Sequence, residues 1–254
     1  MCKILESIIR DHIIKYLTKN DLITPEQHGF VPNKACVTNL LETLDIITEA
    51  IDQRFLVDLV LLDFAKAFDK VSHEKLILKL KEYGISNELV RWVREFLSNR
   101  KQRVTIGDNF SCWEDVVSGV PQGSVLGPLL FTIFINDLPR NIKNIAKLYA
   151  DDCKLIGVIK EPNDIINLQN DIIKLQEWAN TWQMSFNYDK CKVMHFGKKN
   201  LKNIYEMSDK LGSIHKIEKT ESERDLGMII TNNLKWSAQV DKAAKTANSV
   251  LAQF

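Results

Sequence analysis

The sequence predicts an α+β fold, and two observations lead to this prediction. Some segments repeat apolar residues at a spacing of three and four, as helices do, whereas others are short apolar runs bounded by turn residues, as in β-hairpins. A mixture of long helices and short antiparallel hairpins is typical of α+β proteins. With 254 residues, the chain can bury a substantial core as one large domain or two modest ones.

Helical spacing recurs along the whole chain. We expect helices within residues 2–17, 40–51, 76–83, 87–97, 129–134 and 165–182, and from residue 240 onward. Gly84 ends the third of these helices, and Ser86 is a suitable N-cap for the fourth. Two prolines and a glycine mark residues 24–34, between the first two helices, as a loop. The segment that follows Pro162 keeps the spacing over the most turns.

Short apolar and β-branched runs predict the strands. We expect them at residues 57–62, in a hairpin formed by residues 104–106 and 113–117, in a second hairpin at 146–159, and at 192–196 and 226–231. The first strand is broken only by Asp58 and ends at Asp63, whereas Asp151 and Asp152 lie near the middle of the second hairpin. The glycine-rich segment 119–127 is expected to form a turn that opens into a helix.

The composition is that of an ordinary globular protein. Hydrophobic residues make up 45% of the chain and charged residues 26%, which argues against both a disordered chain and a membrane protein. The longest apolar stretch, residues 125–138, is too short and too interrupted to span a bilayer. Residues 1–10 carry charges at Lys3, Glu6 and Arg10 instead of the apolar run of a secretory signal. We therefore expect an intracellular protein of the cytoplasm, the nucleus or both, with no membrane partner.

The cysteines do not indicate a disulfide framework or a zinc site. They are scattered, odd in number and without a CxxC pair. We expect all of them to be free thiols. They are Cys2, Cys36, Cys112, Cys153 and Cys191.

A net charge of +1 gives little support for nucleic-acid binding, but the chain contains two clusters of basic residues. Phosphate binding depends on clustered lysine and arginine, so local charge matters more than the total. The first cluster contains one acidic residue, Glu95, and the second has only Asp189 beside it. Each cluster, taken alone, is also consistent with a solvated charged face. The members are Arg91, Arg94, Arg100, Lys101 and Arg103 in the first, and Lys190, Lys192, Lys198, Lys199 and Lys202 in the second.

Three carboxylates carry the strongest chemical signal. Asp151 and Asp152 are adjacent at a hairpin turn, and two like charges side by side repel unless a cation lies between them. Alone, such a pair is also consistent with a solvent-exposed turn. Asp63 adds a carboxylate at the end of a buried strand, where it is unfavourable without a partner. Three carboxylates converging on one sheet would form a hard oxygen site for Mg²⁺, and a pair of Mg²⁺ ions supports nucleotidyl transfer.

Three segments, in this order, resemble the central palm motifs of reverse transcriptases. They are LDFAKAFD at 62–69, GVPQGSVLGPLLF at 119–131 and YADD at 149–152. Their wording is most similar to the non-LTR (LINE-type, jockey-like) retrotransposon enzymes. The likeness extends from QHGF at 27–30 to DLG at 225–227, which is most of the chain.

The resemblance implies a metal site and a reaction. Asp63 and Asp151 would bridge two Mg²⁺ ions, for which Mn²⁺ is a possible substitute. Asp152 would complete the carboxylate cluster, and the backbone carbonyl of Phe64 would add an oxygen ligand. The implied reaction extends a DNA primer with dNTPs on an RNA template.

The resemblance also implies nucleotide-binding residues. Phe68 would exclude a ribose 2′-hydroxyl, although a core phenylalanine is the alternative. Gln122 and Gly123 would lie on the nucleotide and template, whereas Gly127 is explained by the turn itself. Lys190 would neutralise or protonate pyrophosphate, with plain surface charge as the alternative.

One fingers position departs from the family pattern. Val31 stands where the family usually has arginine, and the later basic position is Lys34. A lysine attracts phosphate as a point charge but lacks the bidentate fork of arginine.

The implied architecture is a right-hand polymerase fold whose palm has an antiparallel sheet packed on helices. Residues 1–232 would hold incomplete fingers and the palm, and residues 233–254 the start of a truncated thumb. We expect the chain to be part of a longer element. Two other hypotheses are an inactive remnant with residual RNA binding and a cellular interaction protein that uses the motifs as turns.

Overall fold

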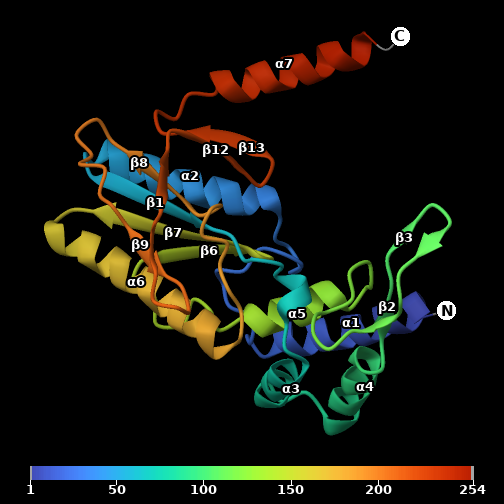
Figure 1. Cartoon of the computed structure of the whole chain (residues 1–254). Helices are drawn as coiled ribbons and strands as arrows, with labels where there is room; N and C mark the ends of the chain where they lie inside the picture. The colour runs from blue at the N-terminus through green and yellow to red at the C-terminus, as the bar shows by residue number, and fades with distance from the viewer. Residues whose placement is uncertain (1, 253–254) are drawn as a thin grey trace.

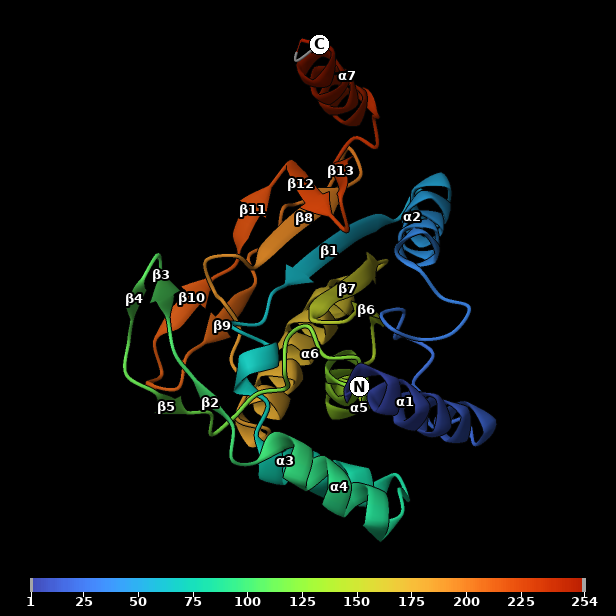
Figure 2. The ribbon, with the colours of Figure 1, turned by 90° about the vertical axis from the view of Figure 1, so that its right-hand side faces the viewer.

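The computed structural model describes residues 2–252, with the side chain of Cys2 outside the description. A five-stranded sheet lies at its centre, with α2 (Cys36–Asp52) on one face and α6 (Pro162–Thr181) on the other (Figures 1 and 2). A block of helices lies at one end of this sheet: α1 (Cys2–Lys19), α3 (His73–Glu82), α4 (Asn87–Leu97) and α5 (Gly127–Ile135). The predicted α+β class is confirmed.

The sheet is almost entirely antiparallel. Its strands run in the order β11-β8-β1-β7-β6, and only β11 is parallel to its neighbour. The central strand β1 therefore pairs on both sides, as the predicted buried strand requires. The strands are β1 (Leu56–Leu62), β6 (Ile145–Tyr149), β7 (Asp152–Ile159), β8 (Lys192–Phe196) and β11 (Glu218–Thr220).

Alternation along β1 explains why helices cover both faces. Val57 and Leu59 pack in the apolar cluster under α2, whereas Val60 and Leu62 pack in the larger cluster with α6 and the helical block. Successive side chains of a strand point to opposite faces, so a strand buried on both faces is apolar at nearly every position. Burial on both faces therefore explains why the run that predicted this strand is apolar at every position except Asp58.

The helix boundaries follow the predicted signals. The Ser86 side chain accepts a hydrogen bond from the Leu89 amide at the start of α4, and Gly84 takes a positive φ of 75° just after α3. A cap of this kind satisfies one of the amides that a helix leaves unpaired. Pro162 is the first residue of α6, where its fixed φ suits a helix start.

Several small strands differ from the prediction. Around Gly107, β3 (Thr105–Ile106) pairs with β4 (Asn109–Phe110) instead of the predicted segment 113–117. That segment lies partly in β5 (Glu114–Asp115), which pairs with β2 (Lys101–Gln102). The expected strand at 226–231 is the second arm of a hairpin formed by β12 (Ser222–Asp225) and β13 (Met228–Thr231), and β9 (Glu206–Ser208) and β10 (Ile214–Lys216) form a further pair.

The last helix, α7 (Ser237–Leu251), extends away from the body beside β13 and has no buried residues (Figure 1). The division of the chain at residue 232 stays a prediction. Cys36, Cys112, Cys153 and Cys191 are free thiols, as expected, and the side chain of Cys2 lies outside the described part. No helix within residues 2–252 is both long enough and apolar enough to cross a bilayer.

The single acid that interrupts β1 anchors a loop. Asp58 is fully buried, and its carboxylate accepts hydrogen bonds from His195 Nδ1 at 2.7 Å, Tyr205 Oη at 2.6 Å and Asn200 Nδ2 at 2.8 Å. Burial alone would raise the pKa of Asp58, but these donors hold it below its usual value. The ionised carboxylate thus joins β1 and β8 to the segment that leads into β9.

We expect Asp58→Asn to destabilise the protein by about 3 kcal/mol at pH 7, because the amide cannot accept all these bonds and brings donors of its own. The depressed folded-state pKa adds stability above the unfolded-state value of 3.8, and this contribution is lost as the pH falls through the folded-state pKa. The difference between the two proteins should therefore shrink in acid.

Urea denaturation at pH 7 and below pH 4 would measure this difference. Asp45→Asn, at an exposed position of α2, is the matched control and should change stability by no more than about 0.5 kcal/mol. Equal stability of wild type and Asp58→Asn at pH 7 would show that the carboxylate does not anchor the loop.

Candidate active site

The turn between β6 and β7 holds Asp151 and Asp152 at one edge of the sheet. Tyr149 pairs with Asp152, and Ala150 takes a left-handed φ of 52°, which closes the turn tightly. The predicted hairpin with two aspartates near its middle is confirmed. Asp151 therefore belongs to the turn, whereas Asp152 is the first residue of β7.

The QHGF segment, residues 27–30, is hydrogen-bonded to this turn. The buried Gln27 side chain accepts hydrogen bonds from the Gly29 amide at 2.7 Å and the Ala150 amide at 3.1 Å. His28 and Leu148 are also joined by a backbone hydrogen bond of 2.9 Å. A Cβ on Gly29 would collide with the Ala150 backbone, so only glycine fits here. No pattern in the sequence indicates this role of Gln27, because the contact joins segments that are distant along the chain.

Strand pairing brings Asp63 beside Asp152. Leu62 pairs with Cys153, and Asp63 is the next residue along β1. Its backbone carbonyl accepts from the Asn187 amide at 2.8 Å, and its carboxylate lies 3.5 Å from Lys190 Nζ. Phe64 turns its buried ring onto Phe186, with ring centroids 4.4 Å apart. The end of β1 is therefore fixed on both sides.

The three carboxylates influence one another. Burial raises the pKa of Asp152 to about 6, and repulsion from Asp151, Asp225 and Asp63 adds to the effect. Burial also raises the pKa of Asp151, with Asp63 contributing repulsion. Carboxylate oxygens are the donors that Mg²⁺ prefers, and a cation would relieve this repulsion, so these residues fit the implied metal chemically. Among residues 2–252, however, no three His, Cys, Asp or Glu side chains are arranged to hold a metal ion.

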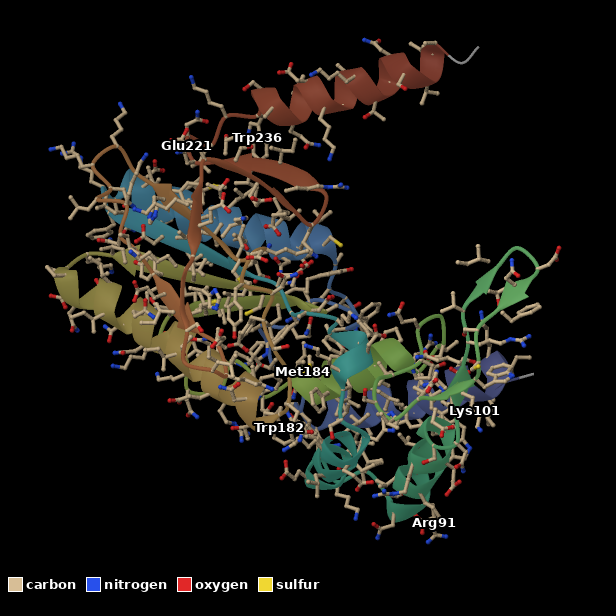
Figure 3. The ribbon with its side chains drawn as sticks, viewed as in Figure 1. Arg91, Lys101, Trp182, Met184, Glu221 and Trp236 are labelled. Carbon is tan, nitrogen blue, oxygen red and sulfur yellow. The ribbon has the colours of Figure 1, made fainter. Side chains whose placement is uncertain are left out.

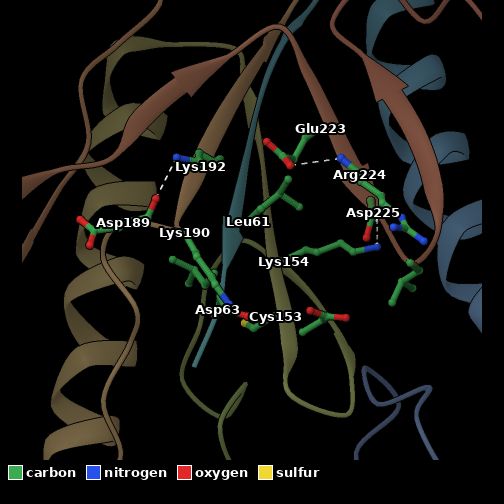
Figure 4. A pocket seen from close by; sticks show the side chains of 13 residues that line it. Leu61, Asp63, Cys153, Lys154, Asp189, Lys190, Lys192, Glu223, Arg224 and Asp225 are labelled. Atoms are coloured by element: carbon green, nitrogen blue, oxygen red, sulfur yellow. Dashed lines mark hydrogen bonds and ion pairs between the residues drawn. The ribbon is translucent and has the colours of Figure 1, made fainter. Parts of the chain in front are cut away.

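A cleft of about 430 Å³ opens beside Asp63 and Asp152 (Figure 4). Lys154 and Lys190 line it together with the turn of the β12–β13 hairpin. Asp151 is not among the lining residues. The cleft is therefore bounded by the end of β1, by β7 and by the segment that leads into β8, with the β12–β13 hairpin on its other side.

The glycine-rich segment is fastened to the segment after Asp63. Val120 donates its amide to the Phe68 carbonyl at 2.9 Å, and Gln122 Nε2 donates to Asp69 Oδ1 at 3.0 Å. At Gly119, which has a φ of 89°, a Cβ would lie 2.8 Å from Asp69 Cα. The segments 62–69 and 119–131 are therefore joined by hydrogen bonds and close backbone contact.

Glycines 123 and 127 have different roles. Gly123 has a positive φ of 79° and open space where a Cβ would stand, so a ligand could approach its backbone. At Gly127, a Cβ would lie 2.6 Å from the Pro121 carbonyl oxygen, so this glycine is required by the turn. The turn therefore explains Gly127, as the sequence suggested.

Phe68, Lys190 and Lys34 differ in their surroundings. Phe68 is half-buried and stacks on the core residue Phe131 with ring centroids 4.4 Å apart. Lys190 is exposed and pairs with Asp63, as noted above. Lys34 instead donates to the Pro25 carbonyl of its own loop, and burial lowers its pKa. The structure therefore brings Lys190 to the carboxylates but leaves Lys34 bound within the fingers loop.

Both basic clusters are partly neutralised. Arg91 and Lys101 are exposed on α4 and β2, on the side of the molecule away from α7 (Figure 3). Some members of each cluster are therefore neutralised by acidic partners or lie on a solvated surface. The ion pairs are Arg94 with Glu74 and Lys101 with Asp115 in the first, and Lys190 with Asp63, Lys192 with Glu218 and Lys202 with Glu221 in the second.

A buried ion pair next to Asp152 was not predicted. Lys154 Nζ lies 2.5 Å from Asp225 Oδ2 and 2.7 Å from Asn39 Oδ1, and all three side chains are buried. The available signal was a lysine inside an otherwise apolar strand, because a buried ammonium requires a partner. The partner itself could not be identified from spacing.

Known proteins are similar to this chain in sequence and in fold. The family model described as reverse transcriptase (RNA-dependent DNA polymerase) matches residues 1–235. The RNA-directed DNA polymerase from mobile element jockey of Drosophila funebris is 32% identical over 206 residues, which is 76% of this chain and 22% of that protein. A probable RNA-directed DNA polymerase from transposon BS of Drosophila melanogaster is 28% identical over 205 residues, covering 75% of this chain and 22% of that protein. The chain thus spans about a fifth of these curated relatives.

The fold is also found in a solved structure. Apo telomerase from Candida tropicalis, truncated from the C-terminal domain, matches with a TM-score of 0.60 at 12% identity, over 90% of this chain and 44% of that one. This likeness concerns the fold alone. The family model and the sequence relatives confirm the resemblance inferred from the three motifs. The chain belongs to the reverse transcriptase (RNA-dependent DNA polymerase) family.

Proposed function

We propose that this chain is the polymerase core of an RNA-directed DNA polymerase of a non-LTR retrotransposon. It would join dNTPs to the 3′-hydroxyl of a DNA primer on an RNA template. The observation that carries the proposal is the register of β1 against β7, which places Asp63 beside the Asp151–Asp152 turn in a chain of this family. The inactive-remnant alternative is not favoured, since the relatives described above are named as polymerases.

The carboxylates define the reacting edge of the cleft. Asp63, Asp151, Asp152 and the Phe64 carbonyl would hold Mg²⁺, or Mn²⁺ in its place. A metal held there would supply Lewis acidity toward the primer hydroxyl and positive charge for the departing pyrophosphate. Lys190 lies in the segment that leads into β8 and contacts Asp63. It would neutralise the departing pyrophosphate or donate a proton to it.

The surface formed by the two fastened segments would receive the nucleotide. Phe68 would pack against the sugar, and Gln122, oriented by Asp69, would contact the incoming nucleotide. Gly123 would let the template approach the backbone. Lys34 would bind the triphosphate from the fingers loop only after its hydrogen bond to the Pro25 carbonyl is broken.

The proposal extends to the layout and setting of the protein. Residues 1–232 would form the fingers and palm, and residues 233–254 the start of the thumb. The enzyme would act inside the cell, in the cytoplasm, the nucleus or both, without a membrane partner.

We expect Asp151→Asn to abolish primer extension, with a loss of at least about 100-fold, because a metal-binding carboxylate contributes several kcal/mol to the transition state. Extension of a labelled DNA primer on an RNA template by the purified chain would measure this. Asp189→Asn, at an exposed acid on the rim of the same cleft, is the matched control and should retain extension. Full activity of Asp151→Asn would refute the site, and RNA binding without any extension by the wild type would instead favour the remnant.

We expect Phe68→Ala to raise ribonucleotide incorporation relative to deoxyribonucleotide incorporation by roughly 10-fold, because the ring would no longer exclude the 2′-hydroxyl. Competing single-nucleotide incorporation would give the ratio. Phe131→Leu disturbs the same aromatic stack from its buried side and should leave the ratio unchanged. If both variants lose stability and neither changes the ratio, Phe68 belongs to the core.

A further inference from the structure

Lys154 is a buried lysine in an apolar strand, close to the carboxylates of the candidate site. It is on β7 two residues after Asp152, so both side chains leave the strand on the same side. Its side chain is only 2% exposed, and the next residue on the same face of β7, Ile156, belongs to the apolar cluster under α2. A buried ammonium is unfavourable unless it is paired and hydrogen-bonded.

Three separate elements, β7, β12 and α2, meet at this ammonium. Figure 4 shows the contact between Lys154 and Asp225. Asp225, the last residue of β12, provides the carboxylate at 2.5 Å, and Asn39 of α2 provides its side-chain oxygen at 2.7 Å. The Asn39 amide nitrogen in turn donates to the Leu148 carbonyl on β6 at 3.1 Å. The network thus joins both arms of the catalytic hairpin to α2 and to the β12–β13 hairpin.

The network also neutralises a fourth carboxylate in the cleft, that of Asp225. Asp225 lines the same cleft as Asp63 and Asp152, and Lys154 is its counter-charge. Asp225 is 4% exposed, and the tight turn after it contains Leu226 at a φ of 44° and Gly227 at 93°. An unpaired Asp225 would be a further cation-attracting group beside Asp152.

We propose that Lys154 is a positioning residue whose buried contacts with Asp225 and Asn39 hold Asp152 in place and keep Asp225 from acting as a competing metal ligand. This inference rests on the proposed polymerase function. Lys154 acts through its neighbours, since its side chain is only 2% exposed and its ammonium is held by Asp225 and Asn39. The β12–β13 hairpin is thereby kept at a fixed place beside the carboxylates.

The test uses Lys154→Met in the full chain, which keeps the length of the side chain but removes its charge. We expect kcat for primer extension to fall at least about 10-fold with little change in the KM for dNTP, because Asp152 loses its positioning. Titration with Mn²⁺, followed by the electron paramagnetic resonance of the free ion, should show a Kd that is at least about 3-fold lower, because Asp225 is left without its counter-charge. Loss of folding would weaken Mn²⁺ binding instead.

Two further variants make the result decisive. Lys147→Met is the matched control, since Lys147 faces Lys154 across the hairpin and pairs with Glu42; it should leave kcat and the Mn²⁺ affinity unchanged. Lys154→Met/Asp225→Leu replaces the pair by apolar side chains and should recover the melting temperature and the wild-type Mn²⁺ affinity, while kcat stays low. Recovery of wild-type kcat in this double variant would overturn the positioning role and leave the pair a stabilising contact.

The failure of this inference differs from failure of the proposed function. If the wild-type chain extends no primer, the proposed function fails, and the Mn²⁺ titration still tests the ion pair. An unchanged or higher Kd for Mn²⁺ in Lys154→Met would then overturn the claim that Lys154 keeps Asp225 from the cation. An unchanged kcat in an active chain would overturn the positioning role.

Discussion

The site depends on holding together carboxylates that repel one another. Asp63, Asp151 and Asp152 are neighbours because β1 pairs with β7 in one register and because the turn before β7 is tight. A shift of one residue in this register would send Asp63 to the opposite face of the sheet. The apolar side chains on both faces of β1 prevent such a shift, because it would turn a buried row toward the wrong helix. Packing of the core therefore supplies the free energy that opposes the repulsion.

Buried polar contacts then make the arrangement specific. Asp58, Gln27 and Lys154 are each fully or almost fully buried, and each joins segments that are distant in sequence. Each such group is costly to bury when any partner is missing, so the networks favour one arrangement of the loops around the sheet. The apolar core accounts for the layers of the fold, whereas these groups fix the loops and hairpins that border the cleft.

Local patterns predicted the parts of the fold that depend on local interactions. The long helices, β1, β8 and the hairpin at Asp151 followed from periodicity and turn residues. The short strands β9 and β10 were not predicted, because they have three residues each and are held from α6, where Gln169 and Gln176 donate to the Glu206 and Ser208 carbonyls. The pairing of β3 with β4 was missed since a tighter turn at Gly107 competes with the longer hairpin.

The same limit applies to the site. The three aspartates were found because a charged group at the end of an apolar strand is visible in the sequence, and the family motifs added Gln122, Gly123 and Phe68. The partner of Lys154, the brace from Gln27 and the internal contact of Lys34 each depend on a side chain from a distant segment. Spacing along one chain carries no information on such contacts.

The contact between Gly29 and Ala150 has a mechanical consequence. Because the two backbones touch and share the Gln27 side chain, a side chain at position 29 would displace the turn that holds Asp151 and Asp152. The position of the two aspartates thus depends on a glycine in a distant segment of the chain.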